Sequence, residues 1–159
     1  MLKLKQPFKT EAEAYDWCLV EGMLRKSRED NRERIRSLLH HAKIASDSAN
    51  DFSKALKPND EKWMTVYTLR YDSIRILTEA FLLLGGSYST NHICLFSALC
   101  VKHPELELDW TFFEKIRMKR NGANYYGETI THADLKDVEL QMKLYESTLR
   151  KEIGKNLEK

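Results

Sequence analysis

Side chains that could bind a phosphate group are concentrated in the segment 115–127 of this 159-residue chain. Guanidinium and amide groups donate hydrogen bonds to phosphate oxygens, and an arginine can contact two of these oxygens at once. The segment supplies four such side chains: Arg117, Arg120, Asn121 and Asn124. Lys115 and Lys119 add positive charge beside them. We therefore take this segment as the candidate binding site for phosphate or nucleic acid.

Arg120 is the most informative of these residues because of the direction in which it points. A helix turns by about 100° per residue, which places Arg120 on the same side as the apolar Phe113 and Ile116. Arginine is rarely buried without a partner. Two interpretations stay open: Arg120 pairs with a buried acid such as Asp72, or it lines a groove that accepts a phosphate ligand.

Two adjacent tyrosines, Tyr125 and Tyr126, follow the donors. They could stack on bases or donate hydrogen bonds to phosphate, although packing in a core also explains such a pair. Gly122 and Gly127 bracket this stretch, and glycine allows a backbone to approach a partner closely. These features extend the candidate site to the end of its helix.

The sequence predicts that the elements positioning this segment are helices. The chain has only six glycines and three prolines, whereas sandwiches, barrels and nucleotide-binding α/β folds need frequent or Gly-rich turns. Capping-box patterns at Thr10–Glu13 and Thr131–Asp134 predict the starts of the first and last helices. Shorter helices are expected over residues 91–102 and from Asp109 into the candidate site.

Two long helices are predicted from apolar stripes. The first ends before Pro58, and its seam has a heptad-like spacing: Ile35, Leu38, Ala42, Ala45, Ala49, Phe52 and Leu56. The second has its N-cap in the Pro58–Asp60 segment, carries an apolar face from Trp63 onward, and runs for about 25 residues until Gly85 and Gly86. We predict a single all-α domain over residues 1–159, an up-and-down bundle of about five to six helices built on two long helices.

Composition limits the function classes. The 26 basic and 24 acidic residues give a net charge of +2, so any attraction to nucleic acid must be local, and no membrane partner is indicated. Three cysteines are too few for a disulfide framework and favour a reducing compartment. Met1–Lys5 lack the apolar core of a signal peptide, and no run reaches the ~18 apolar residues of a membrane span. The chain is predicted to be cytoplasmic, without metal or cofactor.

The stretch from Arg120 to Tyr125 resembles the Arg-Asn-x-x-x-His signature of HEPN domains, the higher eukaryote and prokaryote nucleotide-binding family. Residues 71–86 resemble the long central helix of that family, and residues 91–96 resemble the helix after it. The resemblance implies a helical domain that forms homodimers, with two arginine-containing motifs across a shared cleft. Many members cleave RNA without metal, often as toxins of toxin–antitoxin pairs. Others accompany a nucleotidyltransferase or act as non-catalytic binding modules.

Tyr125 stands where that signature has histidine. Histidine titrates near neutral pH, whereas tyrosine, with a reference pKa of about 10, is a poor base. The resemblance implies Arg120 and Tyr125 as catalytic candidates. The residue types and their spacing give the phosphate-binding candidates: Arg117, Lys119, Asn121, Asn124 and Tyr126. His132 is a candidate replacement for the missing imidazole. The other histidines are expected to be surface or core residues: His40, His41, His92 and His103.

Two functions follow from this pattern. The first is an RNA- or nucleotide-binding homodimer in which metal-independent endoribonuclease activity is weakened or lost. The second is a non-catalytic dimeric helical partner of a nucleotidyltransferase or another protein. Arg120 beside other donors favours the first function, and Tyr125 in place of histidine favours the second.

Overall fold

Helices make up most of residues 7–159, the part of the chain that the computed structural model describes. They are α1 (Glu11–Val20), α2 (Arg32–Ala55), α3 (Trp63–Leu84), α4 (His92–Lys102), α5 (Trp110–Tyr126) and α6 (His132–Leu157). A 3-10 turn, η1 (Pro104–Leu106), precedes α5. The predicted all-α class is confirmed. The prediction about Met1–Lys5 lies outside the described residues.

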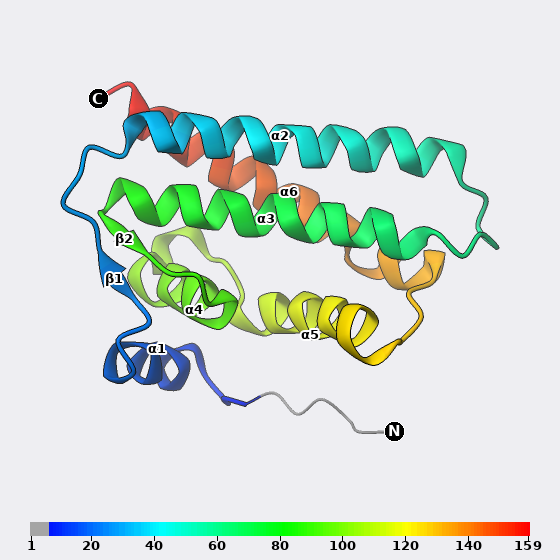
Figure 1. Ribbon diagram of the computed structural model, residues 1–159, viewed down its shortest axis with the longest axis horizontal. Coiled ribbons are helices and arrows are strands. Elements are labelled where there is room, and N and C mark those ends of the chain that lie inside the picture. Colours follow the sequence, from blue (N-terminus) through cyan, green and yellow to red (C-terminus); the bar gives the residue numbers. More distant parts are fainter. Residues whose placement is uncertain (1–6) are drawn as a thin grey trace.

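The helices α2, α3, α5 and α6 run alternately up and down, and α3 lies among them (Figure 1). Three helices are long where the sequence predicted two: α2, α3 and α6 have 24, 22 and 26 residues. The third long helix arises because α6 continues through the charged C-terminal segment as far as Leu157. The central helix α3 packs on α2, α4, α5 and α6, so it connects the candidate site to the core.

Local sequence signals explain these elements. The Thr10 side chain accepts a hydrogen bond from the Glu13 backbone at the start of α1, and both halves of the predicted capping box are present at Thr131 and Asp134. On α2, small side chains of the predicted seam are buried where this helix packs on α3: Ala42, Ala45 and Ala49. Small residues allow the two helix backbones to approach closely, as the seam predicted.

A short β-ribbon was not predicted. Strands β1 (Arg25–Lys26) and β2 (Ser87–Tyr88) pair antiparallel, with Arg25 opposite Tyr88. The ribbon joins the segment after α1 to the segment before α4 (Figure 1). Each strand has only two residues, which is too short for the alternating pattern that identifies strands in a sequence.

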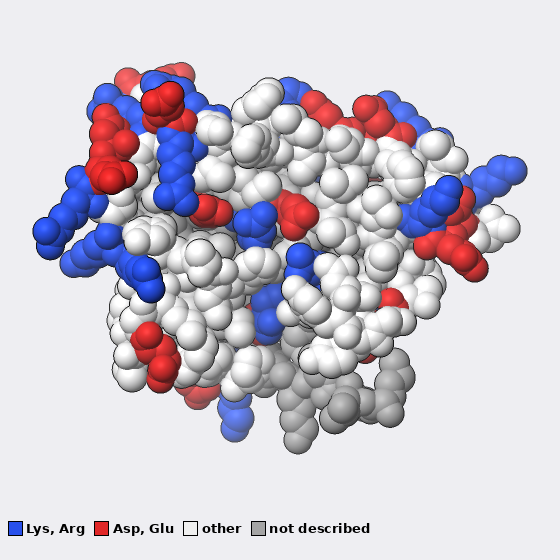
Figure 2. All heavy atoms as spheres, viewed as in Figure 1, with Lys and Arg blue, Asp and Glu red and all other residues white. Residues whose placement is uncertain are grey.

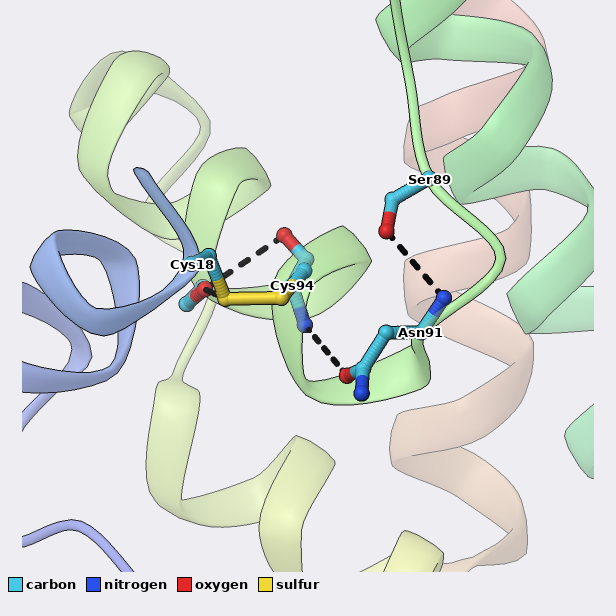
Figure 3. The surroundings of a disulfide bond; sticks show 5 residues. Cys18, Ser89, Asn91 and Cys94 are labelled. Carbon is cyan, nitrogen blue, oxygen red and sulfur yellow. Dashed lines mark hydrogen bonds between the residues drawn. A yellow bond between two sulfur atoms is a disulfide. The ribbon is translucent and has the colours of Figure 1, made fainter. Parts of the chain in front are cut away.

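The structure also contains a disulfide bond between Cys18 of α1 and Cys94 of α4 (Figure 3). The sequence analysis, which found three cysteines too few for a disulfide framework, did not anticipate this single bond, because pairing depends on which helices pack together and not on cysteine number. The two cysteines are 76 residues apart in the sequence. The cysteine count consequently gives no support to the predicted reducing compartment.

The surface agrees with the balanced composition. On the face shown in Figure 2, acidic and basic side chains are interspersed. No helix within residues 7–159 combines the length and the apolar character that a membrane crossing requires.

Candidate functional site

A cavity of about 250 Å³ lies between the start of α4 and the last turns of α5. We call it the Arg120 cavity. The helices α4 and α5 pack on each other and on α3, which brings two distant segments to this place. Four of the predicted residues line the cavity: Arg117, Arg120, Asn121 and Tyr125. The opposite wall is formed by residues 90–93, which the sequence analysis did not connect to the site.

Arg120 lies between two aromatic rings. Its guanidinium carbon is 5.3 Å from the centroid of the Tyr71 ring and 5.9 Å from that of Tyr125. The Nη1 atom donates to Asn121 Oδ1 over 3.2 Å, and the buried Nε has no hydrogen-bond partner within residues 7–159. Cation–π contacts of this kind hold a guanidinium in place without neutralising its charge.

No carboxylate in the described part of the chain forms an ion pair with Arg120. Asp72, the acid that the sequence suggested as a partner, instead lies 3.8 Å from Nε of Arg75. The purely structural interpretation of Arg120 therefore lacks its expected partner. A half-buried guanidinium without a counter-charge is an attractive position for an anionic ligand.

Arg117 has a different environment from Arg120. Its Nε and Nη2 atoms donate to the two carboxylate oxygens of Glu114 over 2.8 and 2.7 Å. The side chains of Arg117 and Glu114 are only 11% and 2% exposed. Arg117 lines the cavity, but Glu114 neutralises its charge and accepts from two of its five N–H donors.

Sequence reasoning missed two residues that define the chemistry of the site, His92 and Tyr71. The Asn91 side chain caps α4 and so places His92 in the first turn, where its ring lines the Arg120 cavity. The Nδ1 atom of His92 is 2.8 Å from the hydroxyl oxygen of Tyr71. The capping asparagine was a usable signal for the helix start, but no spacing rule links residue 92 to residue 120.

Hydrogen bonding and electrostatics define the state of this imidazole. Burial, reinforced by the charges of Arg75, Arg120 and Arg117, lowers the pKa of His92 to about 4. Burial also raises the pKa of Tyr71, so its hydroxyl stays protonated at neutral pH. Because His92 Nδ1 is the one hydrogen-bond partner of that hydroxyl within residues 7–159, we assign Tyr71 as the donor. The neutral ring then carries its proton on Nε2 and is itself a donor.

We expect His92 to titrate near pH 4 in the folded chain, well below the 6.5 of an ordinary histidine. Because the pKa is lowered on folding, the unfolded state binds more protons between these values. The contribution of His92 to stability is therefore complete above pH 6.5 and is lost as the pH falls toward 4. NMR titration of the imidazole protons measures the midpoint, and a His92→Gln variant should show a flatter pH dependence of unfolding. A midpoint at or above 6.5 would contradict the assigned environment.

The remaining predicted residues lie outside the cavity. Lys119 Nζ is 3.4 Å from Asp134 Oδ2. Asn124 and Tyr126 are exposed beyond the lining, and Gly127, with a φ of 67°, ends α5 in the left-handed conformation. The His132 ring packs on Trp63, with centroids 4.4 Å apart, and does not line the cavity. The structure thus brings His92, and not His132, next to Arg120.

Comparisons with known proteins add no further assignment: no family model, curated protein or solved structure matches this chain. The resemblance to HEPN domains stays a prediction that depends on the Arg120 segment and the helices around it. Within residues 7–159, no three His, Cys, Asp or Glu side chains come together in an arrangement that could hold a metal ion.

Proposed function

We propose that the Arg120 cavity binds a phosphate group of RNA or of a nucleotide, in a domain related to the HEPN family. The observation that carries this proposal is the environment of Arg120. Its guanidinium lies in an accessible cavity between two tyrosine rings and has no ion-pair partner in the described chain. A phosphate would supply the missing negative charge and accept its N–H groups.

Other groups around Arg120 suit the same ligand. The side-chain oxygen of Asn91 accepts from the Cys94 backbone N–H, and that of Asn121 accepts from the Arg120 guanidinium. Both side-chain amides therefore keep their NH₂ donors for a ligand. His92 adds the N–H of a neutral imidazole. Tyr125 is 70% exposed and offers a ring face on which a base can stack, a contact worth roughly 1–3 kcal/mol per base.

The proposal is limited to binding and does not include cleavage. Metal-independent cleavage of RNA requires groups that accept and donate protons near neutral pH. His92, the imidazole that lines the Arg120 cavity, has a pKa of about 4. It keeps its proton on Nε2, so it acts as a hydrogen-bond donor. Arg120 and Tyr125 accordingly enter the proposal as ligand contacts.

Replacement of Arg120 tests the proposal. We expect Arg120→Ala to bind a labelled single-stranded oligoribonucleotide about 10- to 100-fold more weakly, because a charge-assisted contact to phosphate is lost. Fluorescence anisotropy between about 50 and 200 mM salt measures this loss. The slope of the logarithm of the binding constant against the logarithm of the salt concentration should become shallower by about 1, the change expected for one lost phosphate contact. Arg36→Ala is the matched control, since Arg36 is exposed on α2 and does not line the cavity.

The alternative function gives a different result. If the Arg120 segment only organises a dimer or a contact with a partner protein, the wild-type chain shows no salt-dependent affinity for RNA. Arg120→Ala then lowers the stability of the dimer, as sedimentation at several concentrations would detect. Equal RNA binding by wild type and Arg120→Ala would likewise exclude the proposed site.

A further inference from the structure

A second, larger cavity adjoins the Arg120 cavity. The second cavity has a volume of about 490 Å³ and shares two lining residues with the first, Thr90 and Asn91. Its other wall is formed by the turn after α1 and by strand β1, including Arg25. We call it the Arg25 cavity. Thr90 and Asn91 line both cavities, so the two cavities are neighbours on the surface. We refer to this pair of cavities, from Arg25 to Arg120, as the groove.

The shared wall of the groove is fixed by short-range hydrogen bonds (Figure 3). The Asn91 backbone N–H donates to Ser89 Oγ over 3.1 Å, and the Asn91 side chain accepts from the Cys94 backbone over 3.2 Å. The disulfide from Cys94 to Cys18 holds α4 against α1, whose following turn forms the opposite wall. The β1–β2 pairing adds a second link between the two walls. The groove is therefore built into the fold.

The Arg25 cavity has the chemistry of a second nucleotide subsite. Arg25 is exposed and forms no ion pair with another residue of the described chain, so its guanidinium is available for a phosphate. Tyr88, its cross-strand partner, is half-buried and contributes an aromatic ring to the lining. Glu21 is the one carboxylate of this lining, and it can accept a hydrogen bond from a ribose hydroxyl.

Cavity size favours a ligand that occupies both subsites. Small-molecule sites generally have volumes of about 300–1,000 Å³. The Arg120 cavity, at about 250 Å³, is below that range, whereas the Arg25 cavity lies within it. A phosphate and part of one nucleoside would occupy the first cavity, and the next nucleotide of the RNA would occupy the second. The aromatic residues, Tyr88 at one end and Tyr125 at the other, fit unpaired bases and not a duplex.

We propose that the groove from Arg25 to Arg120 binds single-stranded RNA across at least two nucleotides, with Arg25 contacting a second phosphate. This inference rests on the proposed function of the Arg120 cavity and specifies its ligand as an oligonucleotide chain. Thr90 and Asn91 lie where the RNA backbone would pass from one subsite to the next. Affinity should therefore depend on the length of the RNA, and that dependence should require Arg25.

The test compares uridine monophosphate with a tetranucleotide of uridine, measured by calorimetry or by competition against a labelled oligoribonucleotide. We expect the wild-type chain to bind the tetranucleotide at least about 10-fold more tightly than the monophosphate. Arg25→Gln should lower the tetranucleotide affinity about 10-fold, so that the preference for the tetranucleotide over the monophosphate is largely lost. Arg28→Gln is the matched control, because Arg28 is exposed nearby but does not line the cavity. Both changes leave the backbone pairing of β1 available, and circular dichroism verifies the fold.

The outcomes separate this inference from the proposed function. If Arg120→Ala weakens both ligands but Arg25→Gln behaves like Arg28→Gln, the second subsite is refuted while the phosphate site at Arg120 stands. Equal affinities of the wild-type chain for monophosphate and tetranucleotide refute the second subsite in the same way. If the wild-type chain binds neither ligand, both proposals fall.

Discussion

Loss of the Cys18–Cys94 disulfide is expected to lower the free energy of unfolding by about 2–4 kcal/mol. The bond closes a loop across a sequence separation of 76 residues, so its removal increases the conformational entropy of the unfolded chain. It also joins α1 to α4, the helix on which α1 mainly packs. The folded state should therefore lose stability first at α1.

Urea unfolding of the oxidised wild type, the reduced wild type and a Cys18→Ala/Cys94→Ala variant measures this effect. The double variant also serves as a control for the reductant, which should not change its unfolding midpoint. Hydrogen exchange should become faster in α1 before it does in α3. An unchanged midpoint for the wild type, after thiol labelling has verified two new free cysteines, would show that the disulfide does not stabilise the fold.

Most of the fold could be predicted because helix signals are local. The Thr10 and Thr131 caps, together with the stripes along α2 and α3, act over one to a few turns of the chain, and the structure confirms them. The disulfide and the two-residue strands could not be predicted, since each depends on segments that are more than 60 residues apart (Cys18 with Cys94, Arg25 with Tyr88). Local sequence patterns carry no information about such pairings.

The candidate site divides along the same line. Helical geometry placed Arg120 on the inward side of its helix, and in the structure its guanidinium lies over the ring of Tyr71 in α3. Tyr71 and His92 belong to two other helices, so they become part of the site only when α3, α4 and α5 pack together. The ion pair of Arg117 with Glu114 has helical i, i+3 spacing, and its burial could not be predicted without that packing.

Removal of the Glu114 charge is expected to destabilise the fold by about 3 kcal/mol. Glu114→Gln keeps the shape of the side chain but leaves the Arg117 guanidinium without its counter-charge, which typically costs about 3–5 kcal/mol in a buried pair. The low end applies because Arg117 is 11% exposed and lines a cavity that water can enter. Urea unfolding measures the change.

A double variant provides the matched control for this prediction. Buried ion pairs can often be replaced by apolar side chains of similar volume with little loss of stability. Glu114→Leu/Arg117→Met should therefore be considerably more stable than Glu114→Gln. If the free energy of unfolding of Glu114→Gln lies within about 0.5 kcal/mol of the wild-type value, as for a neutral surface substitution, Glu114 does not neutralise a buried charge.

The Glu114→Gln variant also separates the roles of the two arginines that line the Arg120 cavity. In the wild type, Glu114 occupies the Nε and Nη2 donors of Arg117, whereas Arg120 has no carboxylate partner in the described chain. Glu114→Gln should release Arg117 toward the cavity, so affinity for a single-stranded oligoribonucleotide should rise, measured where the variant is still folded. Arg120→Ala should lower that affinity. Opposite changes in binding from substitutions six positions apart on α5 would identify Arg120 as the ligand contact and Arg117 as the structural residue beside it.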